Sequence, residues 1–507
     1  MAETKPKSSA IRVARSLEAH SLVAVVFGAL IYILAVTGTL SVFNHEFQRW
    51  ERPDIPEMAS ISPEAAEKAA LTVFESEETP TTHLYINFPM ADLPRTVITT
   101  DTQAFYANAE GTIAGPEEFV WTQFVLDLHY YLHFNEISAL GLLASVVGLT
   151  LVGALGALLL GLSFSGLLAH PRIFRDAFTF RRSAGRLTTV DMHNRLSVWT
   201  LPFHFTNALT GSILGLASIL ALVIAAVGFN NDTGAVFEPI FGGEPDPVEG
   251  EASVADIAGP LHYMAREYPD LAPTYFILHD PGTAGQHSTV IAEHSDRLIF
   301  GEYYNFTAAG DYEGNVGISD GTVGQQLTGA VYNVHFGNWG GLPVKLAYLG
   351  FGIGLCVIVA SGLSLYFAKR EINGRPAPRL AAMWSAIVWG TPALLAVMLI
   401  AAMLGWEGGA LASLFWISLA IVLGGASRST ARAVKPVCQL ATGIALILAL
   451  SIYVSRYGSL AVSDAGMSIT LVIAATALGF LAWALLPYIG QSPKASSDGS
   501  LSYEPAE

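Results

Sequence analysis

Long apolar stretches alternate with polar segments along this chain of 507 residues. Eight of the stretches are long enough, or nearly so, to cross a hydrocarbon core of about 30 Å as helices. They lie near residues 21–43, 137–168, 196–229, 340–368, 382–404, 409–425, 436–454 and 466–488. The pattern predicts an all-α polytopic membrane protein with about eight transmembrane helices.

Composition supports this class, because 52% of the residues are hydrophobic and only 13% are charged, against about 25% charged in soluble domains. The first apolar stretch follows a basic segment, as in a signal peptide. Its apolar run is too long for one, however, and no small-residue cleavage motif follows it. We therefore expect a retained helix.

Basic residues predict the orientation, since cytoplasmic loops of membrane proteins are enriched in Lys and Arg. Such residues precede the first span and follow the second, fourth and sixth. This distribution predicts that both chain termini lie on the cytoplasmic side of a bacterial inner membrane. The two long loops face the other side and are acidic: residues 44–128 carry 15 Asp/Glu against 4 Lys/Arg, and residues 230–338 carry 16 against 2. This charge argues against nucleic acid as a partner and favours neutral or cationic ligands, or it simply keeps the loops soluble.

The first 370 residues consist of two copies of one unit, in which a helix, an extracytoplasmic module and a second helix follow each other. In the first module the pattern predicts a helix over Ser62–Phe74 and strands near His83–Phe88, Arg95–Thr100 and Ala104–Asn108. In the second it predicts a helix over Val254–Glu267 and strands near Thr274–Leu278, Ser288–Glu293 and Gly301–Phe306. Each is a small α+β module.

The whole chain then divides into seven segments. They are 1–43 (tail and first span), 44–128 (first module), 129–229 (second span, basic cytoplasmic loop and third span), 230–338 (second module), 339–370 (fourth span), 371–490 (a four-helix membrane extension) and 491–507 (a disordered cytoplasmic tail). The extension contains no histidine over residues 380–490.

Four histidines stand at the thresholds of the first four apolar segments, and each segment closes with a Thr-Gly or Ser-Gly pair. They are His20 with Thr37-Gly38, His133 with Ser165-Gly166, His193 with Thr210-Gly211, and His335 with Ser361-Gly362. In the first and third segments the offsets from histidine to the closing pair are identical. An ionisable side chain at a membrane boundary is costly and is therefore a functional-site hypothesis.

The chemistry that this pattern favours is ligation of two b-type haems, one in each layer, by neutral imidazoles. The inner layer offers His20, His170, His193 and His204, and the outer layer offers His45, His129, His133 and His335. The internal repeat selects His20 with His193 for the inner haem, and His335 with either His129 or His133 for the outer one. His45 and His170 are candidates for secondary haem contacts, for instance with propionates, or for interfacial side chains.

Spacing relates the remaining histidines to these pairs. His193 and His204 are 11 residues apart, which is three helical turns and the same helix face, with Pro202 between them as a possible kink. His129 and His133 have i,i+4 spacing and would also share a face.

Simpler interpretations exist for each feature. A single histidine at a helix end is commonly an interfacial anchor, and the i,i+4 pair could bind zinc or copper with Asp127 or Glu136. The Thr-Gly and Ser-Gly pairs are typical of close helix packing, which is compatible with making room for a flat macrocycle. No dinucleotide fingerprint or Walker motif is present, so an electron donor must be another protein, a quinol, or a flavin carried elsewhere.

The chain resembles the PepSY-associated transmembrane family, which includes inner-membrane reductases of ferric siderophores. The resemblance covers about residues 10–370 and rests on several short motifs. They are Leu17–His20, Asn44-His45-Glu46 with Gln48-Arg49-Trp50, Asp127-Leu128-His129, Phe178-Thr179-Phe180-Arg181, Asp191-Met192-His193-Asn194, Leu201-Pro202-Phe203-His204 and Val334-His335-Phe336.

The resemblance implies that the two acidic modules are PepSY-like domains. It also implies a di-haem protein that passes electrons outward to an Fe(III) chelate, with His20, His129, His193 and His335 as the first candidates for haem ligands. Tyr303 and Tyr304 are possible contacts for the chelate. The rival functions are a non-redox PepSY-type regulatory or binding protein, associated with peptidase inhibition, and a siderophore permease.

Overall fold

The computed structural model describes residues 8–178, 186–294 and 297–486, apart from residues 244, 246, 247 and 249. The tail at 491–507 and much of the basic loop after the second span lie outside these residues. Within them, eight helices are long and apolar enough to cross a membrane, as the sequence predicts. They are α1 (Ser8–Ser41), α5 (Leu142–Ala169), α8 (Leu201–Gly228), α12 (Gly341–Ile372), α13 (Pro378–Met403), α14 (Gly408–Ala426), α15 (Ala431–Tyr457) and α16 (Met467–Leu485).

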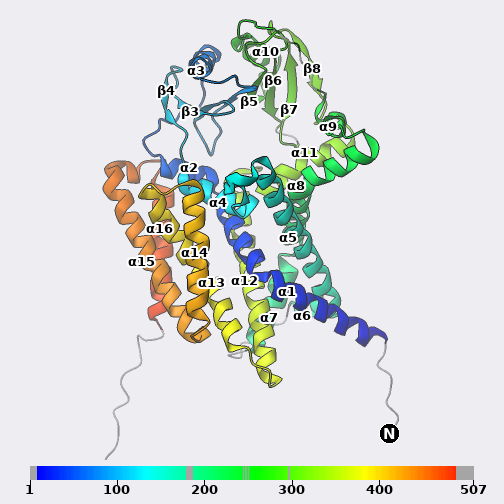
Figure 1. Ribbon diagram of the computed structural model, residues 1–507, viewed down its shortest axis with the longest axis vertical. Helices are drawn as coiled ribbons and strands as arrows, with labels where there is room; N and C mark the ends of the chain where they lie inside the picture. The colour runs from blue at the N-terminus through cyan, green and yellow to red at the C-terminus, as the bar shows by residue number, and fades with distance from the viewer. Residues whose placement is uncertain are drawn as a thin grey trace, which may run out of the picture.

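The two modules form one continuous antiparallel sheet of eight strands on one side of the helix bundle (Figure 1). Its strand order is β4-β3-β2-β1-β5-β6-β7-β8, and the two modules meet where β1 pairs with β5, with His83 opposite His279. The strands are β1 (His83–Asn87), β2 (Thr96–Thr99), β3 (Ala104–Ala107), β4 (Ile113–Pro116), β5 (Ala272–His279), β6 (His287–Glu293), β7 (Glu302–Phe306) and β8 (Tyr312–Val316). The six predicted strands are confirmed, whereas β4, β8 and the joining of the modules were not predicted.

One helix from each module packs on the same core. In α3 (Pro63–Glu75), Ser62 accepts a hydrogen bond from the backbone amide of Ala65 and Pro63 begins the first turn, as expected for a capped helix start. With α10 (Ala258–Glu267), α3 buries apolar side chains of the central strands, such as Ile86 and Phe276. The alternate positions of these strands, including Tyr275 and His279, lie on the opposite face of the sheet.

Short helices lie at the membrane boundary beneath the sheet (Figure 1). They are α2 (Asn44–Glu51), α4 (Val120–Tyr131), α9 (Gly234–Phe241) and α11 (Val323–Phe336). The buried Arg95 guanidinium, next to β2, donates hydrogen bonds to the backbone carbonyls of Arg49 and Arg52, at 3.3 and 2.7 Å. The first module is therefore fixed to the end of α2.

Two predicted helix faces are not continuous. Helix α4 ends at Tyr131, and Leu132 and His133 both have positive φ angles, so His129 and His133 do not share a face. A turn at Thr200 separates helix α7 (Arg186–Trp199) from α8, and Pro202 lies in the first turn of α8. His193 and His204 therefore lie on separate helices. The predicted shared face is therefore wrong for His129 and His133, and a helix break lies between His193 and His204, where the sequence predicts a possible kink at Pro202.

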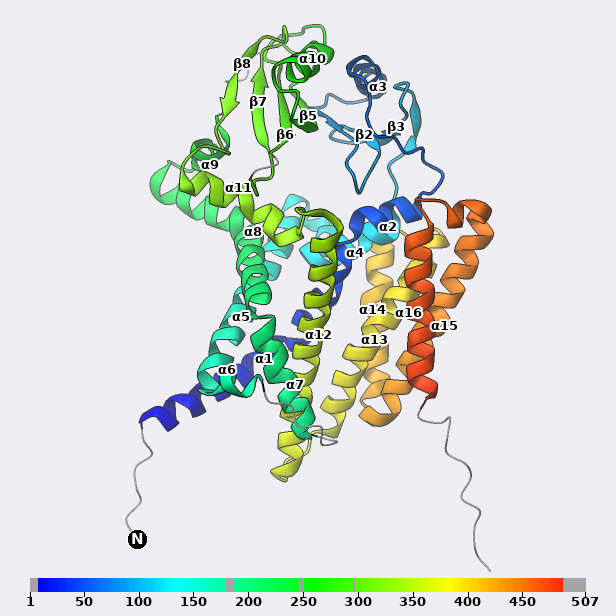
Figure 2. The same cartoon turned by 180° about the vertical axis from the view of Figure 1, so that it is seen from behind.

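Helices α13–α16 form a bundle beside the first four spans (Figure 2). Polar contacts join it to the core at the sheet side. The Trp121 indole donates to the carbonyl of Leu395 at 3.0 Å, and the Tyr453 hydroxyl donates to the carbonyl of Trp50 at 2.7 Å. Because these donors are buried, the bonds fix the bundle against α2 and α4.

Candidate functional site

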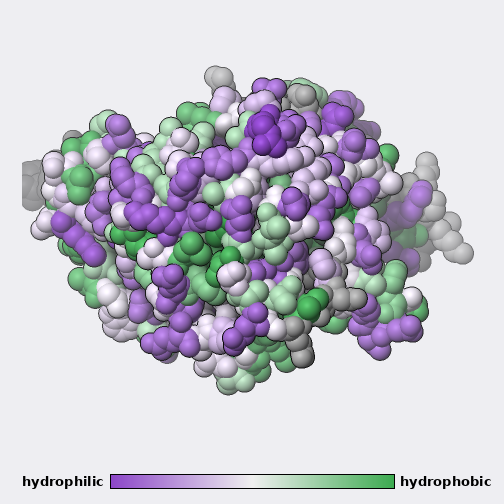
Figure 3. Space-filling model, turned by 90° about the horizontal axis from the view of Figure 1, so that it is seen from above, coloured by the Kyte–Doolittle hydropathy of each residue, from purple (hydrophilic) through white to green (hydrophobic). Residues whose placement is uncertain are grey.

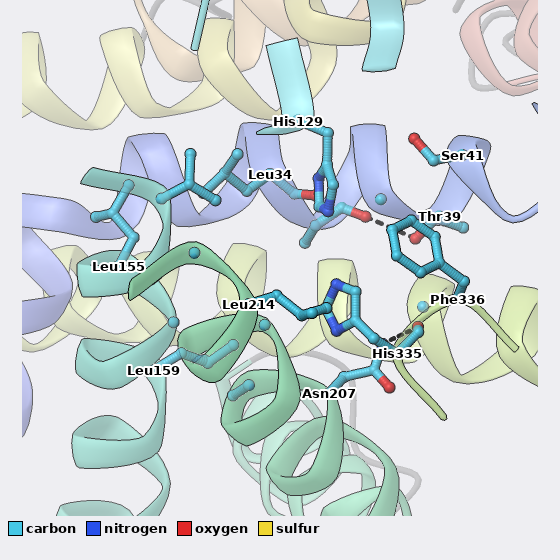
Figure 4. A pocket seen from close by; sticks show the side chains of 18 of the residues that line it. Leu34, Thr39, Ser41, His129, Leu155, Leu159, Asn207, Leu214, His335 and Phe336 are labelled. Carbon is cyan, nitrogen blue, oxygen red and sulfur yellow. Dashed lines mark hydrogen bonds between the residues drawn. The ribbon is translucent and has the colours of Figure 1, made fainter. Parts of the chain in front are cut away.

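Two histidines from the short sheet-side helices share one cavity. His129 lies on α4 and His335 lies near the end of α11, and the centres of their rings are 6.4 Å apart with planes inclined by 24°. Both line a cavity of about 300 Å³ between α1, α5, α8 and α12. Figure 4 shows them reaching this cavity from different helices, with Leu34, Leu155, Leu159 and Leu214 around them. We call His129 and His335 the sheet-side pair.

The Nδ1 atom of each ring is held by a neighbouring helix. His129 Nδ1 lies 3.1 Å from the carbonyl oxygen of Leu34 and 3.3 Å from the hydroxyl of Thr37. Because a carbonyl oxygen only accepts, Nδ1 must carry the proton, and Nε2 keeps a free lone pair. His335 Nδ1 lies 3.0 Å from the hydroxyl of Thr210, and the carbonyl of Asn207 also contacts the ring.

The same arrangement recurs at the other membrane boundary. His20 Nδ1 lies 3.0 Å from the carbonyl oxygen of Leu162 and 3.2 Å from the hydroxyl of Ser165. His193 Nδ1 lies 3.0 Å from the carbonyl oxygen of Ile358 and 3.1 Å from the hydroxyl of Ser361. His193 is also close enough to His20 for the two rings to interact electrostatically. We call His20 and His193 the opposite pair.

A glycine follows each of these hydroxyl residues and leaves space for the ring. A Cβ atom would lie 2.6 Å from His129 Cε1 at Gly38 and 2.7 Å from His335 Cε1 at Gly211. At Gly166 it would lie 3.3 Å from His20, and at Gly362 it would lie 3.2 Å from His193. We call the Ser/Thr-Gly pair and the carbonyl three residues before its hydroxyl residue a histidine seat. Each seat takes a histidine from a different segment of the chain.

Both sheet-side imidazoles are neutral at ordinary pH. Burial lowers the pKa of His129 to about 3, with a smaller effect of the nearby His335, and burial lowers the pKa of His335 to about 4. A neutral imidazole with one fixed N–H and one free lone pair is suited to ligate a metal. The apolar lining of the cavity suits a flat, apolar ligand rather than a hydrated ion.

A family model described as the PepSY-associated TM region matches residues 17–370. The chain belongs to this PepSY-associated family. The uncharacterized protein PA4219 of Pseudomonas aeruginosa is similar to it, with 28% identity over 245 residues. The matched region is 44% of this chain and 60% of that protein, so the chain spans about 60% of its relative's length.

The structure resolves where the other candidate histidines of this PepSY-associated protein lie. His133 is turned away from the shared cavity, and its ring contacts Phe124, Phe415 and Trp416. His204 contacts the hydroxyl of Thr200, at 3.2 Å. Neither residue is among those that line the cavity with His129 and His335.

His45 and His170 each lie beside a carboxylate, at the two boundaries. His170 Nε2 lies 3.5 Å from Asp176, and His45 Nδ1 lies 3.0 Å from Asp92. Lys345 Nζ also lies 2.9 Å from the Asp92 carboxylate, so Asp92 connects the first module to the start of α12. Among the described residues, no three His, Cys, Asp or Glu side chains converge on a common metal position, which weighs against the zinc or copper interpretation.

A row of aromatic rings leads from the sheet-side pair to the sheet. His335 contacts Phe336, and the ring centres of Phe336 and Tyr332 are 4.4 Å apart. Tyr332 lies 5.1 Å from Phe300, which lies 5.8 Å from Tyr275 on β5. Sequence reasoning did not find this row, because its members come from separate elements, although Tyr332 and Phe336 have i,i+4 spacing.

The two tyrosines predicted as chelate contacts occupy different faces of β7. Tyr304 is buried beneath Tyr268, which directly follows α10, and is 4% exposed, so it is not available to a ligand. Tyr303 is partly exposed on the other face, beside Phe241. Viewed from the sheet side, the surface is mostly hydrophilic with apolar residues between, as expected for a face in contact with water (Figure 3).

Proposed function

We propose that this protein is an inner-membrane electron-transfer protein that holds two b-type haems and reduces a ferric siderophore or another Fe(III) chelate on the extracytoplasmic side. The observation that carries the proposal is the fourfold histidine seat, arranged as two pairs. Each imidazole has its Nδ1 engaged and its Nε2 free. Two such nitrogens per site would be able to hold the iron of a b-type haem.

The geometry of the sheet-side pair supports the proposal. A metal–imidazole bond is about 2 Å long, so two imidazoles on opposite sides of one ion have ring centres about 6 Å apart. The observed separation is 6.4 Å. The cavity between the helices is apolar, and Gly38, Gly211 and Gly215 are among its lining residues.

Bound haem would supply one-electron carriers near the two membrane surfaces, between a quinol or flavoprotein donor and the chelate. The residues of the chain position these carriers. The hydrogen bonds from Nδ1–H to the carbonyl oxygens orient the rings. They also raise the basicity of Nε2, because the carbonyl oxygens carry partial negative charge. The aliphatic lining gives the rings an apolar environment.

The aromatic row supports an exit path for electrons toward the sheet. Phe336, Tyr332 and Phe300 form a packed bridge from the sheet-side pair to Tyr275. Electron tunnelling is faster through packed atoms than across a gap, so the chelate is expected to dock near this end of the row. Each turnover moves one electron and converts one Fe(III) to Fe(II).

Absorption spectroscopy of the purified protein reduced with dithionite tests the proposal. We expect b-type haem bands and two haems per chain, with one haem lost in His129→Ala or His335→Ala and the other lost in His20→Ala or His193→Ala. His133→Ala serves as the matched control and should keep both haems. A spectrum without haem bands would favour a regulatory protein or a permease, and a full haem content in His129→Ala would contradict the pairing.

A further inference from the structure

A second cavity, of about 290 Å³, lies at the sheet-side boundary and is lined by acidic groups. It lies between the start of α4, the turn that follows α4 and the start of α14. Its carboxylates are Glu117, Glu118, Asp127, Glu136 and Glu407, and none of the described residues that line it is Lys or Arg. The cavity therefore concentrates negative charge in one partly enclosed space.

The imidazole of His133 also lines this cavity and is only 4% exposed. Its Nε2 lies 2.9 Å from the carbonyl oxygen of Phe124, so Nε2 carries the proton and donates it. Nδ1 is then a bare lone pair, and it has no hydrogen-bond partner in the protein. A buried acceptor without a partner is costly and needs an explanation.

The carboxylates of the lining and the Nδ1 atom of His133 are all hydrogen-bond acceptors, so each of them needs a hydrogen-bond donor or a cation as its partner. Gln123 offers a side-chain amide, but it donates to Asp127 at 2.9 Å. A cation surrounded by water supplies both positive charge and hydrogen-bond donors. We propose that this cavity binds a hydrated divalent cation, held through its water shell by Glu117, Asp127, Glu136, Glu407 and His133.

The spacing of the acidic groups favours a hydrated ion over a bare one. No three of the described His, Cys, Asp and Glu side chains converge closely enough to coordinate one ion directly. Small divalent cations such as Mg²⁺ commonly keep several waters when they bind proteins. A water molecule takes about 30 Å³ in the liquid, so the cavity has room for an ion with its shell.

The C-terminal extension builds one wall of this site. Glu407 directly precedes α14, and a Cβ atom at Gly408 or Gly409 would lie 3.3 or 3.6 Å from the Glu136 carboxylate. The glycines thus let Glu136 approach the N-terminus of α14, whose backbone amides favour a negative charge. Residues beyond the matched region 17–370 therefore complete a site that the core begins.

One carboxylate of the cavity lies within electrostatic range of Tyr275, at the end of the aromatic row. Glu117 is close enough to Tyr275 to contribute to the raised pKa of that phenol, although burial is the larger cause. On the proposed function, which this step assumes, the physiological ion is the Fe(II) that leaves the reduced chelate. The cation site itself does not depend on that assignment.

Binding of Mn²⁺ to the purified full-length protein, followed by loss of the free-ion electron paramagnetic resonance signal, tests the inference. We expect one saturable site per chain, and an affinity weaker by about tenfold or more in the double variant Glu136→Gln/Glu407→Gln. The control Glu267→Gln/Glu313→Gln removes the same charge from exposed positions of the second module and should bind as the unchanged protein does. His133→Phe, which removes the lone pair but keeps a ring, should also weaken binding.

Absence of a saturable site, or equal binding by the acidic-cavity variant and its control, would overturn the inference. The assay contains no chelate and no electron donor, and haem content is recorded separately from the absorption spectrum. A protein that binds Mn²⁺ but lacks haem would therefore refute the proposed reductase and keep the cation site. The reverse result would refute only the cation site.

Discussion

The sheet-side pair and the opposite pair use the same seat but differ in how the histidine is supplied. His129 and His335 both come from short helices outside the spans, whereas in the opposite pair His20 lies within α1 itself and only His193 comes from such a helix, α7. The sheet-side seats are also tighter, because a Cβ atom at their glycines would lie 2.6 and 2.7 Å from the ring, against 3.3 and 3.2 Å at the opposite seats.

In the first copy of the repeat, one helix contributes to both pairs of histidines. Helix α1 offers His20 to a seat on α5, and its Thr37-Gly38 seat receives His129. In the second copy, His193 of α7 reaches a seat on α12, and the Thr210-Gly211 seat of α8 receives His335. Helix α1 therefore links the two pairs in the first copy, whereas in the second copy His193 and the Thr210-Gly211 seat lie on the successive helices α7 and α8.

We expect the largest effect from glycine substitutions in the seats, which should affect the sheet-side pair and leave the opposite pair intact. Gly38→Ala places a methyl group where His129 stands, so the ring must move and the sheet-side haem should be lost. Gly166→Ala makes a contact of 3.3 Å with His20, which a small shift relieves, so both haems should remain. Haem content per chain measures both. Equal haem loss in the two variants would show that the seats do not differ in tightness.

A smaller effect is expected from the aromatic row, which leads to the sheet-side pair. Tyr332→Leu or Phe300→Leu should slow oxidation of the dithionite-reduced protein by an Fe(III) chelate several-fold, because the packed bridge is interrupted. The haem spectrum should stay unchanged. Tyr263→Leu, an aromatic position on α10 outside the row, is the control. Stopped-flow absorption measures the rates, and equal rates in all three variants would exclude the row as the exit path.

The smallest effect is expected from the seat hydroxyls. Thr37→Val and Ser165→Ala each remove one contact to Nδ1, but the carbonyls of Leu34 and Leu162 keep the ring in place. A single hydrogen bond contributes about 0.5–1.5 kcal/mol, so haem should stay bound with a modest change in midpoint potential. Redox titration measures the change for each haem separately. Loss of haem in either variant would mean that the hydroxyl, and not the carbonyl, fixes the ring.

The sequence predicted most of the secondary structure, because the apolar runs and the alternating strands are local signals. It missed β4 and β8, which contain Gly115 with Pro116 and Gly314, residues that favour turns when considered alone. These segments become strands because each pairs with a strand already present in the sheet. The β1–β5 pairing joins residues far apart in the chain, and local patterns carry no information about it.

The sequence by itself determined the spans, the acidic loops, the four Ser/Thr-Gly pairs and the set of histidines, since each depends on composition or spacing along the chain. Only the tertiary structure decided which histidine enters which seat. The choice between His129 and His133 depends on the left-handed turn at Leu132 and His133, a conformation that bulky residues rarely adopt and that no local propensity predicts. Seats and histidines come from different helices, so the packing of the helices brings them together.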